Sequence, residues 1–179
     1  ALGLEPGRYL SVIARAEPEN SLLEIVEGFS RKPRGMKLAV LGKYEDGNAY
    51  HQAVKAAAGN EVMFLGAIYD KKVVQALRFH SAAYVHGHQV GGTNPSLVEA
   101  LGAGNAVIAH DNRFNRWVAG PGAAFFDGAA GFATQLDAIL ADPTRLDSMR
   151  KASRERFLAE FQWEKILSEY ETLLLKYQK

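Results

Sequence analysis

The sequence predicts one α/β domain with three layers, in which a six-stranded parallel sheet carries helices on both faces. Three observations predict this fold class. First, the chain has 179 residues of which 47% are hydrophobic, which is enough for one well-packed domain and too little for two ordinary ones. Second, short β-rich runs alternate with amphipathic helical stretches, a pattern typical of parallel sheets. Third, the alternation ends near Pro143, and only helical patterns follow.

The strands and helices can be placed from hydrophobic spacing. Strands are expected at residues 9–14, 36–42, 61–66, 82–86, 106–110 and 123–127. The first helix is indicated by apolar residues at helical spacing from Leu22 to Phe29, with Asn20 or Ser21 as its N-cap. Further helices are expected at residues 49–58, 71–79, 96–103 and 131–140. This order of elements is typical of a Rossmann-like domain.

A last helix, within residues 160–179, carries an apolar stripe that needs a partner surface. The stripe consists of Trp163, Ile166, Leu167, Tyr170, Leu173, Leu174 and Tyr177. Either the domain itself covers this stripe, or the helix reaches toward an N-terminal domain that this chain lacks. The chain begins with Ala1 and runs almost directly into a strand pattern, so we expect a domain taken from a longer protein.

The amino-acid composition argues against some classes of binding partner. The chain has 21 basic and 20 acidic residues and no long basic run, which argues against nucleic acid. It has no cysteine, which excludes disulfides and thiolate metal sites and favours a cytoplasmic location. No apolar stretch approaches the roughly 20 residues of a membrane span, so we expect membrane association only through parts outside this chain.

Candidate ligand contacts follow the strands, because open parallel sheets bind ligands at the carboxyl ends of their strands. Arg15 follows the first strand, and its planar guanidinium suits a diphosphate. An alternative is that Arg15 pairs with Glu17 or Glu19 on the surface. Asn20, at the start of the next helix, is a second candidate contact. Ile68 follows the third strand and could cover a flat ring.

The loop after the fourth strand is the most informative segment. It comprises Gly91, Gly92, Thr93, Asn94, Pro95 and Ser96. The paired glycines free the backbone, Asn94 is expected to be the N-cap and Pro95 the first helical residue. The helix should then point unpaired N–H groups and the positive end of its dipole at an anion.

Glu99 lies one turn further along the same helix. A carboxylate at this position can reach a ligand lying over the helix start and accept hydrogen bonds from two ribose hydroxyls. The alternative is an ordinary solvated glutamate.

Two other kinds of site are disfavoured. His80, His86 and His88 suggest a metal, but no carboxylate partner lies near them in the sequence, so no metal is expected. No G-x-G-x-x-G motif follows the first strand, which argues against a dehydrogenase.

Residues 12–20, 64–66 and 95–109 resemble the C-terminal, donor-binding domain of GT-B fold glycosyltransferases, specifically family 4 (glycosyltransferase group 1). The resemblance covers essentially the whole chain. It implies that Glu99 binds ribose, that Arg15 binds phosphate and that residues 92–94 border the transferred sugar. It also implies a UDP-sugar or dTDP-sugar as substrate, with a GDP-sugar as a further option, and no separate cofactor.

The sequence departs from this family at two positions. The first of the family's two glutamates falls at Gly91, and its phosphate-binding lysine falls at Asn20, so both positions have lost a charge. Residues 18–20 and 91–95 are more narrowly similar to bacterial rhamnosyltransferases of surface polysaccharide synthesis.

The resemblance implies a retaining hexosyltransferase that moves a hexose or deoxyhexose from a nucleotide sugar to a saccharide or lipid-linked acceptor, in bacterial surface polysaccharide or lipopolysaccharide synthesis. The acceptor would be held by the absent N-terminal domain, so the isolated domain should transfer little sugar. Two alternatives stay open: a non-catalytic module that binds a nucleotide sugar or another protein, and a sugar-nucleotide epimerase.

Overall fold

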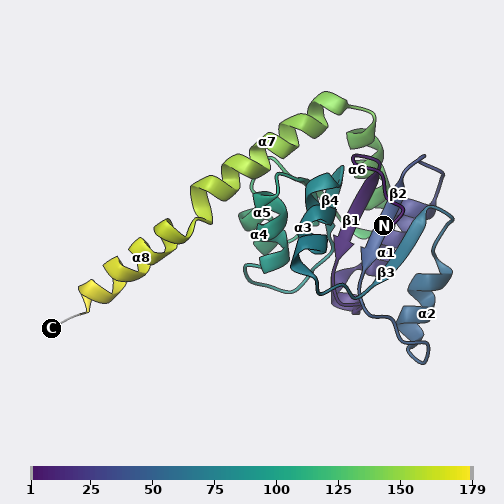
Figure 1. The fold of residues 1–179 in the computed structure, drawn as a ribbon, viewed down its shortest axis with the longest axis horizontal. Helices are drawn as coiled ribbons and strands as arrows, with labels where there is room; N and C mark the ends of the chain where they lie inside the picture. Colours follow the sequence, from purple (N-terminus) through teal and green to yellow (C-terminus); the bar gives the residue numbers. More distant parts are fainter. Residues whose placement is uncertain (1, 178–179) are drawn as a thin grey trace.

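A six-stranded parallel sheet forms the centre of the molecule in a computed structural model, which describes residues 2–177 (Figure 1). The strands are β1 (Tyr9–Ile13), β2 (Lys37–Leu41), β3 (Val62–Gly66), β4 (Ala83–His86), β5 (Ala106–His110) and β6 (Ala124–Phe126). Their order in the sheet is β3-β2-β1-β4-β5-β6, and every pair is parallel. The predicted fold class is confirmed. Strands β1 to β3 follow one another toward one edge of the sheet, and β4 to β6 toward the other. The order thus changes between β1 and β4, and sheets of this kind bind ligands at that point.

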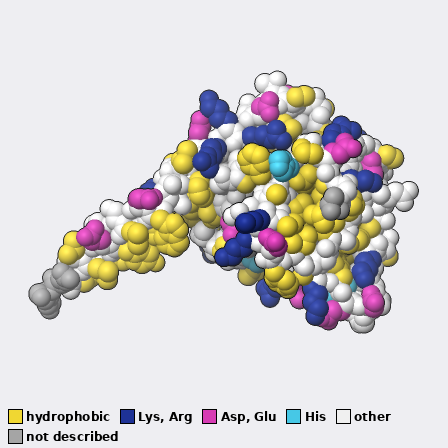
Figure 2. Space-filling view, viewed as in Figure 1, with side chains coloured by type: hydrophobic (Ala, Val, Ile, Leu, Met, Phe, Trp, Pro, Cys, Tyr) yellow, Lys and Arg dark blue, Asp and Glu magenta, His cyan; other side chains and the backbone are white. Residues whose placement is uncertain are grey.

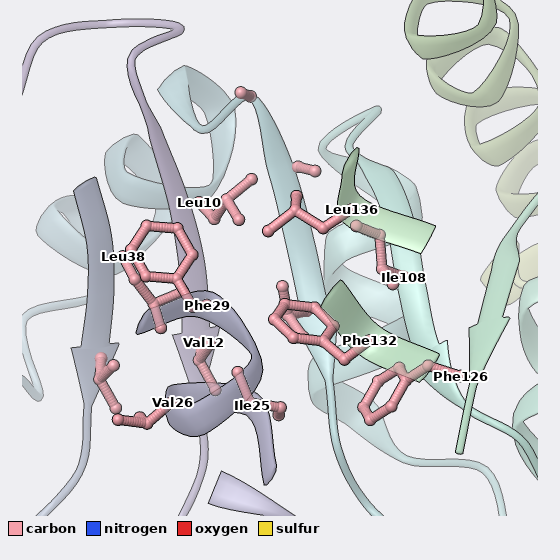
Figure 3. Packing of buried hydrophobic residues seen from close by; sticks show 14 of the residues in the cluster. Leu10, Val12, Ile25, Val26, Phe29, Leu38, Ile108, Phe126, Phe132 and Leu136 are labelled. Carbon is pink, nitrogen blue, oxygen red and sulfur yellow. The ribbon is translucent and has the colours of Figure 1, made fainter. Parts of the chain in front are cut away.

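Helices cover both faces of this sheet. They are α1 (Leu22–Ser30), α2 (Ala49–Ala56), α3 (Lys71–His80), α4 (Pro95–Gly102), α5 (Arg113–Ala119) and α6 (Gly128–Leu140). Successive strand residues point to opposite faces. Leu10 therefore packs with Phe29 of α1 and Leu136 of α6 (Figure 3). Its neighbour Tyr9 packs with Leu77 of α3 on the opposite face. Helices α4 and α5 lie on the same face as α3, over β5.

Gly28 allows α1 and α6 to pack closely. A Cβ atom at this position would lie 2.5 Å from the backbone oxygen of Ala129. A glycine in the middle of a helix is normally unfavourable, but here it lets two backbones approach each other.

The start of α1 differs from the prediction. Ser21 occupies the N-cap position, but neither it nor Asn20 caps the helix with its side chain. The Ser21 hydroxyl donates instead to the Gly87 carbonyl oxygen at 2.8 Å, and the Asn20 amide donates to the Arg15 carbonyl oxygen at 3.0 Å. Because both side chains bond to these other segments, neither is available to cap α1. Residues Pro18–Asn20 form a 3-10 turn, η1.

Two helices on the later half of the sheet also differ from expectation. Helix α5 was not predicted, because its seven residues are too few to show a repeated helical pattern. Helix α6 begins at Gly128, three residues before the expected start at residue 131. Its first turn is composed of glycine and alanine, which carry no apolar pattern.

The two C-terminal helices behave differently from each other. Helix α7 (Pro143–Glu160) packs across α4 and β5, whereas α8 (Trp163–Lys176) projects away from the sheet (Figure 1). No residue of α8 is buried. The interpretation that the domain covers the apolar stripe itself is therefore wrong, and Figure 2 shows hydrophobic side chains exposed along this arm. None of the helices among residues 2–177 combines the length and hydropathy that crossing a membrane requires.

Candidate functional site

The carboxyl ends of β1 and β4 are held together by Gly87. A Cβ atom there would lie 2.0 Å from the backbone oxygen of Asn20, so only glycine lets the end of β4 approach the turn that follows β1. The hydrogen bond from Ser21 to the Gly87 carbonyl closes the same contact. One cavity opens at this junction and reaches Asn94 before α4, and a second lies beside α4.

The smaller cavity has a volume of about 170 Å³, and the predicted site residues Arg15, Asn20 and Asn94 line it together with His86 and His88. Arg15 is exposed. Among residues 2–177, it forms no ion pair with Glu17 or Glu19, so the alternative of surface pairing is not realised. The guanidinium is available to a ligand.

The buried Asn20 amide fixes the ring of His88. Its nitrogen donates to the Arg15 carbonyl at 3.0 Å, and its oxygen lies 2.8 Å from Nδ1 of His88. A backbone carbonyl can only accept, so the amide orientation is determined. The Asn20 oxygen must then accept from His88, which places the imidazole proton on Nδ1. Asn20, predicted as a ligand contact, therefore directs its carbonyl oxygen at His88; direct contact with a ligand stays a prediction.

His86 is the buried histidine of this cavity. Burial, followed by the neighbouring His88, lowers the pKa of His86 to about 3, so its imidazole is neutral near pH 7. Its Nε2 atom is buried and has no hydrogen-bond partner among residues 2–177. A buried polar atom without a partner is costly unless a ligand or water satisfies it.

The start of α4 confirms one local prediction and corrects another. Asn94 is the N-cap and accepts a hydrogen bond from the Ser96 N–H at 3.0 Å, and Pro95 is the first helical residue. However, the N–H groups of Leu97 and Val98 both donate to the Asn94 carbonyl oxygen. The prediction of unpaired N–H groups at this helix start is wrong, because the cap already satisfies them. The positive end of the helix dipole is what remains for an anion.

The glycine loop before α4 is exposed. Gly91, Gly92 and Thr93 are all open to solvent, and Gly92 has a φ of 100°, which favours glycine. A Cβ atom on Gly91 would lie 2.6 Å from the ring of Phe114, a residue of α5. The aromatic ring thus lies against the position where the family that the sequence resembles is expected to place a carboxylate.

The larger cavity has a volume of about 850 Å³ and lies between α3, α4 and α7. Ile68 and Glu99, both predicted as site residues, line it together with Tyr69 and Val98. The Glu99 side chain is 58% exposed, and one of its oxygens pairs with Arg78 at 2.7 Å. It is thus not the freely solvated glutamate of the alternative interpretation.

Arg78 and Tyr84 connect the two cavities, and sequence reasoning missed both. Arg78 is buried, pairs with Glu99 and donates to the Ser96 hydroxyl at 3.0 Å; that hydroxyl lies 2.7 Å from the Tyr84 hydroxyl. Burial raises the pKa of Tyr84, so its hydroxyl keeps its proton. A signal was present in the sequence, because Arg78 shares one helical face with Val74 and should have been recognised as a charge on the buried side of α3.

No group of three or more metal-binding side chains comes together among residues 2–177. His86 and His88 lie near each other, with ring centroids 6.1 Å apart, but exposed His80 at the end of α3 is not among the residues that line either cavity.

Solved structures share this fold. Sucrose-phosphate synthase from Thermosynechococcus elongatus has 20% sequence identity and a TM-score of 0.82, covering 96% of this chain and 46% of its own. HepE from Anabaena, in complex with UDP, has 15% identity and a TM-score of 0.82, covering 94% and 49%. The C-terminal domain of a glycosyl transferase group 1 family protein (LpcC) from Francisella tularensis has 18% identity and a TM-score of 0.73, covering 88% of each chain.

The chain therefore spans less than half the length of the first two proteins and most of the third, which is itself a C-terminal domain. No curated protein sequence matches it significantly. The family model described as glycosyl transferases group 1 matches residues 4–156. On this match, the chain belongs to the group 1 glycosyltransferases and has the Rossmann-like fold of their C-terminal domains.

Proposed function

We propose that this chain is the donor-binding domain of a retaining glycosyltransferase, and that a nucleotide sugar lies across the carboxyl ends of β1 and β4. The observation that carries the proposal is a pair of cavities linked by the hydrogen bonds of Arg78, Ser96 and Tyr84. Ile68 and Glu99 line one of them, and Arg15 lines the other. The similarity to HepE, whose structure contains UDP, supports a nucleotide ligand.

Each cavity suits one part of such a ligand. In the larger one, the base would lie beside Ile68 and the ribose hydroxyls would donate to Glu99. One Glu99 oxygen pairs with Arg78, which leaves the other free and holds the carboxylate in place. In the smaller one, Arg15 would bind the diphosphate and stabilise it as the leaving group. The sugar would then lie near Gly92, Thr93 and Asn94.

The complete enzyme would transfer a hexose or deoxyhexose to a saccharide or lipid-linked acceptor, in bacterial surface polysaccharide synthesis. We place the acceptor on an N-terminal domain outside this chain, because the chain spans only 46% of sucrose-phosphate synthase. The exposed stripe of α8 would contact that domain. The absence of cysteine supports the cytoplasm as its location.

Isothermal titration calorimetry tests donor binding directly. The chain is titrated with UDP-glucose, dTDP-glucose and GDP-mannose, and we expect at least one to bind. Glu99→Gln should weaken that binding by about 1–3 kcal/mol, because a charged hydrogen-bond acceptor is lost. Glu169→Gln, which changes an exposed glutamate of α8 outside both cavities, should have no effect. Absence of binding by all three ligands would contradict the proposal.

One observation favours a second candidate, a non-catalytic donor-binding module. Phe114 covers Gly91, where a carboxylate would be expected in the related enzymes. A sugar-transfer assay on the full-length protein separates the two, because turnover excludes the non-catalytic module and binding without turnover supports it. The isolated chain should show no transfer in either case, since one wall of the cleft is missing.

A further inference from the structure

The backbone of His88 is fixed by hydrogen bonds to two other segments of the chain. Its carbonyl oxygen accepts hydrogen bonds from the side-chain amides of Asn112 and Asn115, at 3.0 and 2.8 Å. The N–H of the next residue, Gln89, donates to the Glu19 carbonyl oxygen at 2.8 Å. Two separate segments of the chain, α5 with its N-cap and the turn after β1, therefore fix the backbone on which this imidazole stands.

The imidazole ring is also oriented. Because the Arg15 carbonyl fixes the Asn20 amide, and that amide fixes the proton on Nδ1 of His88, only Nε2 of His88 is left for a ligand. The ring is partly buried and lines the same small cavity as Arg15. A side chain whose tautomer and position are both set by neighbours is preorganised to bind.

The cavity around this ring suits an anion. The charged or titratable residues that line it with His88 are Arg15, Tyr84 and His86, and no aspartate or glutamate is among its lining residues. His86, with its pKa lowered to about 3, and Tyr84, with its pKa raised, both stay neutral near pH 7. Nε2 of His86, which has no hydrogen-bond partner among residues 2–177, is independent evidence that this cavity binds a polar group.

We propose that His88 binds the diphosphate of the nucleotide sugar through Nε2, and that the charge of His88 sets how tightly the donor is held. This inference rests on the proposed function. When protonated, His88 donates a charge-assisted hydrogen bond from Nε2 to a phosphate oxygen, beside the guanidinium of Arg15. When neutral, with its proton on Nδ1, it has no donor at Nε2 and the contact is lost. At about 170 Å³, the cavity is smaller than the roughly 300–1,000 Å³ of a typical ligand pocket, so it suits one part of a ligand.

Donor affinity should therefore fall as pH rises. Calorimetry with UDP-glucose, dTDP-glucose and GDP-mannose is carried out from about pH 5.5 to about pH 8. The phosphates of these ligands are diesters and keep their charge throughout. We expect the wild-type affinity for the ligand that binds to fall about tenfold across this range.

Two variants separate the role of Nε2 from that of Nδ1. His88→Asn can keep the hydrogen bond to Asn20 but lacks Nε2, so its affinity should be independent of pH and equal to that of the wild type at the alkaline end. His80→Gln removes an exposed histidine outside both cavities and should keep the wild-type pH dependence. ¹⁵N NMR of the free protein provides a second readout, and the neutral imidazole of His88 should carry its proton on Nδ1.

The outcomes distinguish this inference from the proposed function. Binding with the same affinity at every pH, unchanged in His88→Asn, overturns the role of His88 and leaves donor binding intact. A neutral His88 whose proton lies on Nε2 in the free protein overturns the argument from Asn20. Failure of all three ligands to bind at any pH overturns the proposed function and, with it, this inference.

Discussion

Arg78 holds the carboxylate of Glu99 in place. Its guanidinium is buried, with a side chain only 6% exposed, and its partners are Glu99 and Ser96. Nε of Arg78 has no partner among residues 2–177. A buried charge that loses a partner is costly, whereas a neutral group of the same shape can still accept a hydrogen bond.

The two common substitutions of Glu99 should thus differ in stability. We expect Glu99→Ala to lower the free energy of unfolding by about 1–2 kcal/mol, which allows for the exposure of the Glu99 carboxylate. Glu99→Gln should lower it by less, because the amide oxygen still accepts from Arg78. Urea denaturation measures both. A Glu99→Ala variant as stable as the wild type would show that the pair contributes nothing to the fold.

His86 predicts an acid-sensitive fold. Its pKa in the folded protein is about 3, below the value of about 6.5 for an unperturbed histidine, so the unfolded chain takes up the proton first as pH falls. The stability that His86 contributes is present above pH 6.5 and is lost as pH falls toward 3. Unfolding free energy should therefore decrease between about pH 7 and about pH 4 more steeply in the wild type than in His86→Gln. Parallel pH profiles would contradict the burial of a neutral His86.

At the scale of elements, the sequence predicted what local chemistry decides. The six strands followed from their apolar runs, and Asn94-Pro95 marked the start of α4 because capping is local. Three interactions between distant segments were not predicted. They are the hydrogen bond from Ser21 to the Gly87 carbonyl, the pairing of Arg78 with Glu99, and the orientation of His88 by Asn20. The cap of α4 also uses the N–H groups that were expected to be free, because one carbonyl, that of Asn94, accepts from two of them.

The contact between α1 and α6 can be tested with two glycines. Gly28→Ala should lower the free energy of unfolding by about 1–3 kcal/mol, because its Cβ would meet the Ala129 backbone oxygen at 2.5 Å and a backbone cannot move aside easily. Gly131→Ala is the matched control, since the nearest atoms to its Cβ, on Phe126, are 4.0 Å away. That variant should be stabilised by about 0.5–1 kcal/mol, as alanine favours a helix. Chemical denaturation of both variants checks this, and similar effects of the two substitutions would contradict it.

At the scale of the whole molecule, α8 stands apart because it has no buried residue. The stripe of exposed apolar side chains includes Trp163 and Tyr170, which are 72% and 62% exposed. Large apolar surfaces of this kind mark contacts with other proteins or domains. In our proposal this surface contacts the N-terminal domain that holds the acceptor.

Removing α8 should leave the fold intact. A chain that ends at Gln162 should have the same free energy of unfolding as residues 1–179, because no residue of α8 is buried. Thermal and urea unfolding of the two chains provide the comparison. A clear loss of stability in the shorter chain would mean that α8 folds back onto the sheet in solution.

The position of a bound nucleotide sugar tests the central claim most directly. A crystal structure of the chain with whichever nucleotide sugar binds in calorimetry should show the ribose hydroxyls on Glu99, the base beside Ile68 and the diphosphate between Arg15 and His88. A nucleotide bound elsewhere on the molecule, or one whose diphosphate points away from the carboxyl ends of β1 and β4, would contradict the account.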